Sequence, residues 1–88
     1  MKTIYLRSFE KDIKKIKNNK IKTQLKNVLL DIEKVDSVDD IANIKKLKSF
    51  DVAYRVRVGQ YRLGMFIENK TVTFARFVKR EDIYKIFP

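Results

Sequence analysis

Residues 52–64 read VAYRVRVGQYRLG and carry the clearest pattern in the chain. Apolar and basic residues alternate on either side of Gly59-Gln60, and a period of two is typical of β-strands. Glycine tolerates the positive φ that the first central position of a two-residue hairpin turn requires. The stretch therefore predicts a β-hairpin in which Arg57 lies directly opposite Arg62.

This register places Arg55, Arg57 and Arg62 on one face of the hairpin, because side chains alternate along a strand. The opposite face is apolar and is expected to face the core; it holds Val52, Tyr54, Val56, Val58, Tyr61 and Leu63. A like-charge cross-strand pair destabilises a hairpin by about 0.2–1 kcal/mol. Arginines in this position suit a phosphate-binding floor, since a guanidinium binds a phosphodiester through two donors. A solvated polar face is the alternative. Gly64, opposite Arg55, is expected to leave open space for a base or a ribose.

The N-terminal part of the chain predicts a strand followed by two helices. Residues 2–6 are expected to form the strand, and Ser8 is expected to cap a helix whose apolar stripe continues to Ile16. Asn18-Asn19 marks a turn, and residues 21–35 carry a longer apolar helical face. Ser37 with Asp40 resembles a capping box and predicts a short helix or turn that continues through residues 41–44.

The C-terminal part predicts a return strand at 61–67, a turn at 68–70, a third strand at 71–78 and a short helical tail at 81–87. A three-stranded meander cannot bury its apolar face alone, so the two helices are expected to pack against it. The first strand is expected to join the sheet. The predicted fold is a single α+β domain over residues 1–88, with two layers and the order β-α-α-β-β-β plus a tail.

Composition narrows the classes of function. The chain has 88 residues, 21 Lys and Arg against 11 Asp and Glu, and a net charge of +10. It has no Cys and no His, which excludes disulfides, histidine-ligated zinc and Ser-His or Cys-His catalytic pairs. Asp36, Asp39 and Asp40 do not have the spacing of a calcium loop, so neither a metal nor a cofactor is expected. Apolar runs are too short for a membrane span or a signal peptide. We expect a cytoplasmic protein with a polyanionic partner.

Basic residues also dominate the predicted helices. Residues 2–26 hold nine Lys or Arg and two acids. The lysines expected on outward faces, and as candidate RNA contacts, are Lys11, Lys14, Lys15, Lys22 and Lys26. Such a surface suits the backbone of an RNA, with a steep dependence of affinity on salt. A solubilising lysine-rich surface is the alternative.

Two residues after the last strand are candidates for the same site. Arg80 is expected to reach over the end of the arginine face, and Tyr84 follows one helical turn later. The alternative for Tyr84 is that it closes an edge of the core together with Ile83 and Phe87. The face of Arg76 depends on the length of the second turn, and the sequence does not determine it.

These residues also carry a resemblance to a known family. Residues 46–48 read KLK, and residues 54–64 read YRVRVGQYRLG. Together they resemble the K-L-K … Y-R-I-R-V-G-x-Y-R core of the RelE/ParE toxin superfamily. The ending FVKREDIYKIFP at 77–88 resembles the closing H-R-x-x-I-Y segment of that family. The predicted order of elements and the length agree with it.

The resemblance implies a toxin of a type II toxin–antitoxin system with RelE-like activity. Such a toxin enters the ribosomal A site and cuts mRNA without a metal. The catalytic positions implied by the motif are Arg55, Arg57, Arg62, Arg80 and Tyr84. The implied additional RNA contacts are Lys46, Lys48 and Lys79, the last standing where many relatives have His. The implied partners are the ribosome, mRNA and a cognate antitoxin, which would be acidic and partly disordered.

Three other functions fit parts of the sequence. ParE-like toxins share the fold and inhibit DNA gyrase, but they generally lack the full basic set on the strand face. A non-catalytic RNA-binding or ribosome-binding module would fit the charge alone. An inactive relative of the toxins would fit the replacement of His by Lys79. The presence of all five candidate catalytic residues favours the ribonuclease.

Overall fold

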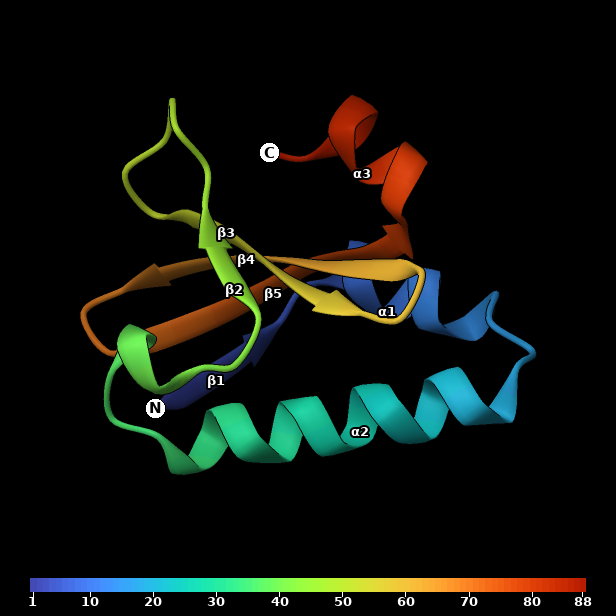
Figure 1. The fold of residues 1–88 in the computed structure, drawn as a ribbon, viewed down its shortest axis with the longest axis horizontal. Helices are drawn as coiled ribbons and strands as arrows, with labels where there is room; N and C mark the ends of the chain where they lie inside the picture. Colours follow the sequence, from blue (N-terminus) through green and yellow to red (C-terminus); the bar gives the residue numbers. More distant parts are fainter.

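The computed structural model describes residues 1–88 and has a five-stranded sheet in the order β1-β5-β4-β3-β2. The strands are β1 (Lys2–Tyr5), β2 (Ile44–Lys46), β3 (Ala53–Val58), β4 (Tyr61–Glu68) and β5 (Thr71–Lys79). The helices are α1 (Arg7–Lys14), α2 (Asn19–Lys34) and α3 (Arg80–Ile86), with a 3₁₀ turn η1 (Val38–Asp40) before β2. Strand β1 is parallel to β5, and all other neighbours are antiparallel (Figure 1).

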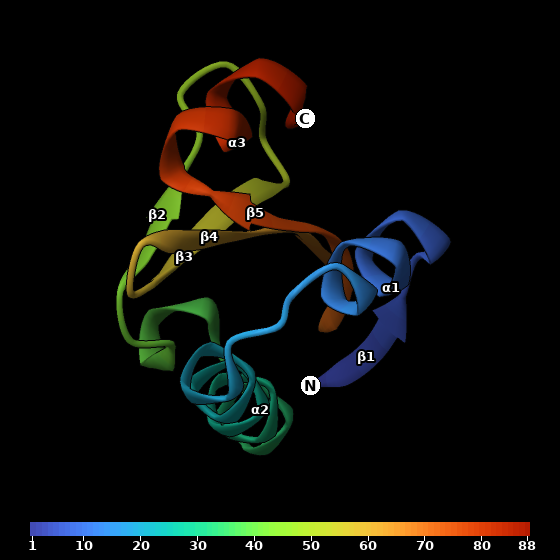
Figure 2. The ribbon, with the colours of Figure 1, turned by 90° about the vertical axis from the view of Figure 1, so that its right-hand side faces the viewer.

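The sheet has helices on both faces. Helices α1 and α2 contribute Phe9, Leu25 and Ile32 to the main core, which also contains the buried strand residues Val56, Val58, Leu63, Met65, Val72, Phe74 and Phe77. Helix α3 lies on the face opposite α2 (Figure 2). The predicted α+β fold is confirmed, and the C-terminal helix adds cover on the second face.

The predicted hairpin register is confirmed. Strand β3 pairs with β4 so that Val58 lies opposite Tyr61 and Arg57 lies opposite Arg62. Gly59 has a φ of +59°, the left-handed conformation that glycine adopts without steric cost. The valine side of β3 is the core side, as the alternation predicts, and the arginines occupy the other face.

The predicted short helix or turn that begins at Ser37 is confirmed, but its predicted continuation through Ile44 is wrong. The 3₁₀ turn ends at Asp40, with the Ser37 side chain accepting from the backbone N–H of Asp39. Ile44 begins β2, an edge strand of three residues whose pairing with β3 places Lys45 opposite Arg55. A strand this short has too few residues to show a period of two, so its pairing depends on contact with β3.

The prediction that Ser8 caps the first helix is also wrong. Helix α1 begins at Arg7, and the hydroxyl of Ser8 donates to the carbonyl of Ala75 at 2.6 Å. Strand β1 ends opposite Phe74, so the edge of β5 beyond that point has no strand beside it. Ser8 supplies a hydrogen bond there, because a buried backbone carbonyl that has no neighbouring strand needs another partner.

Asp12 supplies the remaining contacts at this edge. Its side chain is 4% exposed and accepts from Arg76 Nε at 2.7 Å and Arg76 Nη2 at 3.0 Å. It also accepts from the backbone N–H of Phe77 at 2.9 Å. Ala75 is the extra residue of a β-bulge between β4 and β5, where the register shifts. Asp12 therefore joins α1 to β5 immediately after the bulge. Its ion pair gives Arg76 a structural role at this edge.

Helix α2 begins where the sequence predicts a turn. Asn18 is its N-cap and accepts from the backbone N–H groups of Lys20 and Ile21.

The five lysines expected to point outward from the two N-terminal helices are exposed. None of the helices combines the length and the apolar character that crossing a bilayer requires.

Replacing Asp12 by Ala is expected to lower the free energy of unfolding by about 3 kcal/mol, because it leaves Arg76 and a buried backbone donor without partners. Asp12→Asn keeps one acceptor oxygen and is expected to lose about half as much. Urea unfolding measures both. Asp31→Ala removes an exposed acid and is the control, with a change within about 0.5 kcal/mol. Equal effects of Asp12→Ala and Asp31→Ala would show that the α1–β5 contact is not stabilising.

Candidate functional site

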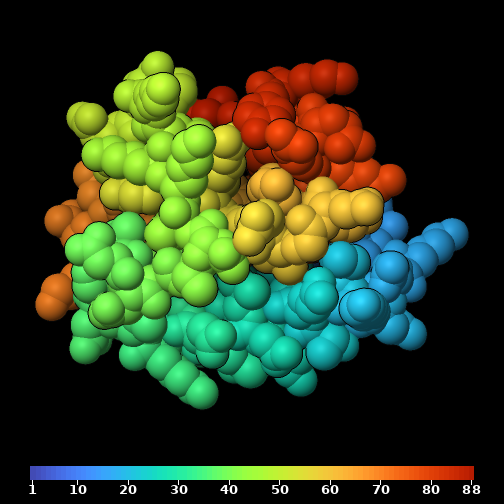
Figure 3. All heavy atoms as spheres, viewed as in Figure 1, coloured from blue at the N-terminus to red at the C-terminus, as the bar shows by residue number.

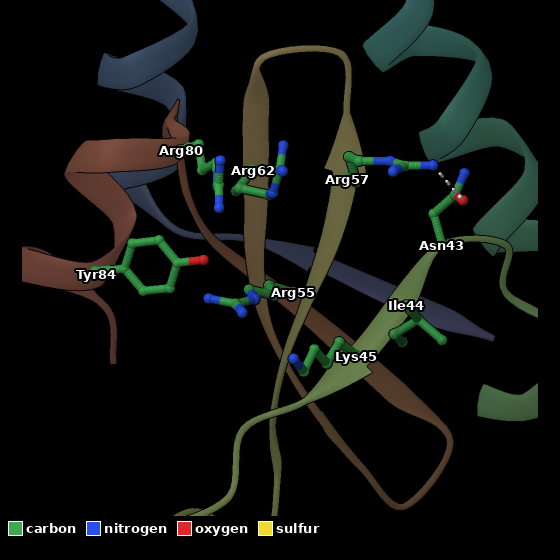
Figure 4. Close-up of a pocket in the computed structure, with 8 residues that line it drawn as sticks. All are labelled: Asn43, Ile44, Lys45, Arg55, Arg57, Arg62, Arg80 and Tyr84. Carbon is green, nitrogen blue, oxygen red and sulfur yellow. Dashed lines mark hydrogen bonds between the residues drawn. The ribbon is translucent and has the colours of Figure 1, made fainter.

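The second face of the sheet has a hollow of about 540 Å³ lined almost entirely by polar side chains. Figure 3 shows α3 and the β2–β3 segment as raised parts of the surface on either side of it. The lining residues are Asn43, Ile44, Lys45, Arg55, Arg57, Arg62, Arg80 and Tyr84 (Figure 4). All five candidate catalytic residues from the sequence therefore lie around one space.

The floor of the hollow is the hairpin of β3 and β4. Arg55, Arg57 and Arg62 project from it because they share the face opposite the core. The Nη1 atom of Arg62 donates to the carbonyls of Gly59 at 3.0 Å and Tyr61 at 2.9 Å, which ties this guanidinium to the turn. Burial and the positive charge of Arg80 lower the pKa of Arg62.

One wall of the hollow is α3. The backbone N–H of Arg80 donates to the carbonyl of Gln60 at 2.9 Å, so the start of the helix is held beside the hairpin turn. Tyr84 follows one turn later and is 57% exposed. The Cζ atom of Arg55 lies 4.6 Å from the centre of the Tyr84 ring, a cation–π contact. Tyr84 therefore does not close the core; Ile83, which is 1% exposed, does.

The opposite wall is the start of β2, which no pattern in the sequence places at the site. Asn43 has a φ of +60° and accepts from Arg57 twice. Its carbonyl takes the backbone N–H of Arg57 at 3.2 Å, and its Oδ1 takes Nη2 at 3.4 Å. Lys45 follows on the same side of the strand. The pairing of β2 with β3 would have revealed both residues, but the sequence carries no periodic signal for β2.

The cations of the hollow have no acidic partner. No Asp or Glu lines it, and the one salt bridge in the structure joins Arg76 to Asp12 elsewhere. Two like-charge pairs face each other across strands, Arg57 with Arg62 and Lys45 with Arg55. Such pairs are unfavourable in the free protein. The arrangement is suited to an anion with several negative charges, such as a nucleic-acid backbone.

The expectation that Gly64 leaves open space is wrong. A Cβ at this position would lie 2.9 Å from the ring of Phe87. The same ring packs against Phe66 with centroids 5.2 Å apart. The chain following α3 therefore folds back over Gly64, and the glycine is needed for this close approach rather than for a ligand.

The candidate RNA-binding lysines lie outside the hollow. Lys46 follows Lys45 on the strand and pairs with Tyr54, whose side chain packs against the main core. Lys48 lies in the following loop, and Lys79 lines a separate hollow with Gln24 and Gln60. The lysines of the N-terminal helices are Lys11, Lys14, Lys15, Lys22 and Lys26. Contact of any of these with RNA stays a prediction.

The electrostatics of the hollow act on Tyr84. The neighbouring guanidinium of Arg80 is the main cause that lowers the pKa of Tyr84, and the positive charge of Arg55 lowers it further. Guanidinium groups hold their protons throughout the physiological range. The hollow can therefore bind and polarise a phosphate through its arginines, and Tyr84 can exchange a proton. No cluster of three Asp, Glu, His or Cys side chains is arranged to hold a metal ion.

Comparisons relate the whole chain to known toxins. It is 34% identical over 89 residues to Toxin RelE3 of Methanocaldococcus jannaschii, covering 100% of both proteins. It also matches a chain of the RelB–RelE antitoxin–toxin complex from Methanococcus jannaschii. That match has a TM-score of 0.82 and 30% identity, and it covers 97% of this chain and 99% of that chain. YoeB from Staphylococcus aureus matches with a TM-score of 0.71 at 18% identity, covering 90% and 94%, which shows the shared fold. No model of a protein family matches the chain.

Arg57→Gln is expected to raise the free energy of unfolding at low salt by about 0.5 kcal/mol, because it removes the repulsion from Arg62. The gain is expected to shrink at high salt, where surface charges are screened. Urea unfolding at low and high salt measures this. Arg7→Gln removes the same charge from the exposed start of α1. It measures the part of the stability gain that comes from the lower net charge alone. An equal gain in both variants would contradict a local repulsion in the hollow.

Tyr84 is expected to lose its proton at lower pH than an ordinary tyrosine, because Arg80 and Arg55 favour the phenolate and lower its pKa. Ultraviolet absorbance during a pH titration measures phenolate formation. Tyr84→Phe is expected to remove this early titration, and Arg80→Ala is expected to shift it to higher pH. Persistence of the early titration in Tyr84→Phe would assign it to another tyrosine.

Proposed function

Because the chain belongs to the RelE family of toxins, we propose that it is a ribosome-dependent endoribonuclease that cuts mRNA in the A site and stops translation. The observation that carries this proposal is the hollow itself. Four arginines without acidic partners surround one space together with an exposed tyrosine. That set provides charge for a phosphate and a group that exchanges protons.

The proposed reaction is attack of a ribose 2′-OH on the adjacent phosphate, without a metal. Arg62 and Arg80 would stabilise the negative charge that develops on the phosphorane, which is often the largest single contribution to catalysis. Arg55 and Arg57 would orient the RNA backbone. Tyr84 would accept the proton of the 2′-OH, because its neighbours favour the phenolate.

Dependence on the ribosome follows from the weakness of the isolated site. A phenol with a pKa that is lowered from about 10 is still a scarce base at neutral pH. Alignment of the attacking oxygen with the phosphorus supplies up to about 7–11 kcal/mol in well-oriented reactions. We propose that the ribosome supplies this alignment, so free RNA is a poor substrate.

The proposed protein partner is an acidic, partly disordered antitoxin. Solved relatives of the fold include antitoxin–toxin complexes, RelB–RelE and DinJ–YafQ. The net charge of +10 favours an acidic segment that wraps the toxin and covers the arginines. The ribosome and mRNA are the other proposed partners. The lysines proposed to contact their backbones are the eight candidates outside the hollow, Lys11, Lys14, Lys15, Lys22, Lys26, Lys46, Lys48 and Lys79.

Two other functions are separable by experiment. A gyrase inhibitor of the ParE type would act on DNA supercoiling and would not need the exposed tyrosine. A non-catalytic RNA-binding module would bind without new RNA ends. The tyrosine beside unpaired arginines favours the ribonuclease over both.

Primer extension on an mRNA in a purified translation reaction tests the proposal. New 5′ ends within the reading frame are expected only when translating ribosomes are present. Arg62→Ala and Arg80→Ala are each expected to slow cutting by at least about 100-fold, because each removes charge from the phosphorane. Lys85→Ala, at an exposed position on α3, the helix that begins with Arg80, is the control for charge loss. Intact cutting by both arginine variants, or cutting of free mRNA at the same rate, would contradict the mechanism.

A further inference from the structure

Lys45 is the only amine in the hollow. It lies on β2 directly opposite Arg55 of β3, and its side chain lines the same space as Tyr84. Lys46, the next residue, pairs with Tyr54, whose side chain packs against the main core on the other side of the sheet. Alternation along the strand therefore brings one of the two neighbouring lysines into the hollow.

The two groups that exchange protons stand on opposite walls. Tyr84 comes from α3 and Lys45 from β2, and Figure 4 shows the guanidinium of Arg55 between the phenol and the amine. The contact of Arg55 with the Tyr84 ring at 4.6 Å and its pairing with Lys45 agree with this view. A phosphate bound to Arg55 would have Tyr84 on one side and Lys45 on the other.

We propose that Lys45 is a catalytic residue that donates the proton to the 5′-oxygen of the leaving nucleotide. This inference rests on the proposed ribonuclease activity. In the step, the 2′-oxygen bonds to phosphorus and its proton passes to the Tyr84 phenolate. The bond between phosphorus and the 5′-oxygen breaks, and that oxygen takes a proton from the Lys45 ammonium. The products are a 2′,3′-cyclic phosphate and a 5′-hydroxyl, and water returns the two residues to their starting states.

The assignment of acid and base follows from the chemistry of the two side chains. A lysine is an ammonium with three donors at neutral pH, which suits a proton donor. The phenol of Tyr84 is pushed toward its charged form by Arg80 and Arg55, which suits an acceptor. In-line displacement places the attacking and leaving oxygens on opposite sides of the phosphorus. Tyr84 and Lys45 meet this requirement, because they stand on opposite walls of the hollow.

A substrate with sulfur in place of the bridging 5′-oxygen separates proton donation from binding. A thiolate leaves without protonation, because a thiol is far more acidic than an alcohol. Programmed ribosomes are given an mRNA with either oxygen or sulfur at the cut site that primer extension has mapped. Lys45→Gln is expected to slow cleavage of the oxygen substrate by at least about 100-fold. Cleavage of the sulfur substrate is expected to stay within about threefold of the wild-type rate, as no donor is needed.

Two variants control for charge. Lys45→Arg keeps the positive charge but holds its proton, so it is expected to be slow on oxygen and fast on sulfur. Lys34→Gln loses the same charge at the exposed end of α2 and is expected to cut both substrates normally. Urea unfolding checks that each variant is folded.

The remaining outcomes each have one meaning. Equal slowing of both substrates by Lys45→Gln would overturn the proposal and leave Lys45 as a binding residue. Normal cutting of the oxygen substrate by Lys45→Gln would also overturn it. Failure of the wild-type protein to cut the oxygen substrate would instead refute the proposed ribonuclease, and the role of Lys45 with it.

Discussion

The carboxylate of Asp12 holds helix α1 against the edge of β5 that β1 leaves uncovered. It accepts two hydrogen bonds from Arg76 and one from the backbone of Phe77. These contacts lie just after the bulge at Ala75, where the register of β4 and β5 shifts. The last residues of β5 then lead into α3, whose first residue is Arg80. The contacts of Asp12 at the sheet edge therefore position the end of β5, from which the chain enters α3 and the site.

Two groups of arginines in this protein have opposite environments. Arg76 has a buried acidic partner, and the hydrogen bond that it donates to Asp12 raises its pKa. The arginines of the hollow have no acidic partner, and burial with the charge of Arg80 lowers the pKa of Arg62. The first arrangement stabilises the fold. The second is unfavourable until an anion arrives, which is the pattern expected where binding rather than stability has shaped the residues.

The hollow is built from three separate segments of the chain. The hairpin forms its floor, α3 forms one wall, and the start of β2 forms the other. Asn43 connects the β2 wall to the floor through its two contacts with Arg57. The site therefore exists only when the sheet is complete, and its wall positions place Tyr84 and Lys45 on opposite sides of Arg55.

The pattern of residues is enough to predict the hairpin, its register and the shared face of Arg55, Arg57 and Arg62, because a two-residue turn and a period of two leave one pairing. It also indicated Arg80 and Tyr84 as neighbours of that face. The β2 wall, the partner of Arg76 and the closure over Gly64 by Phe87 depend on which separate segments pack together, and only the folded chain shows them. Local periodicity carries no information on which segments meet across a sheet edge. Lys45 could therefore be placed in the site only from the pairing of β2 with β3, which no short-range pattern in the sequence indicates.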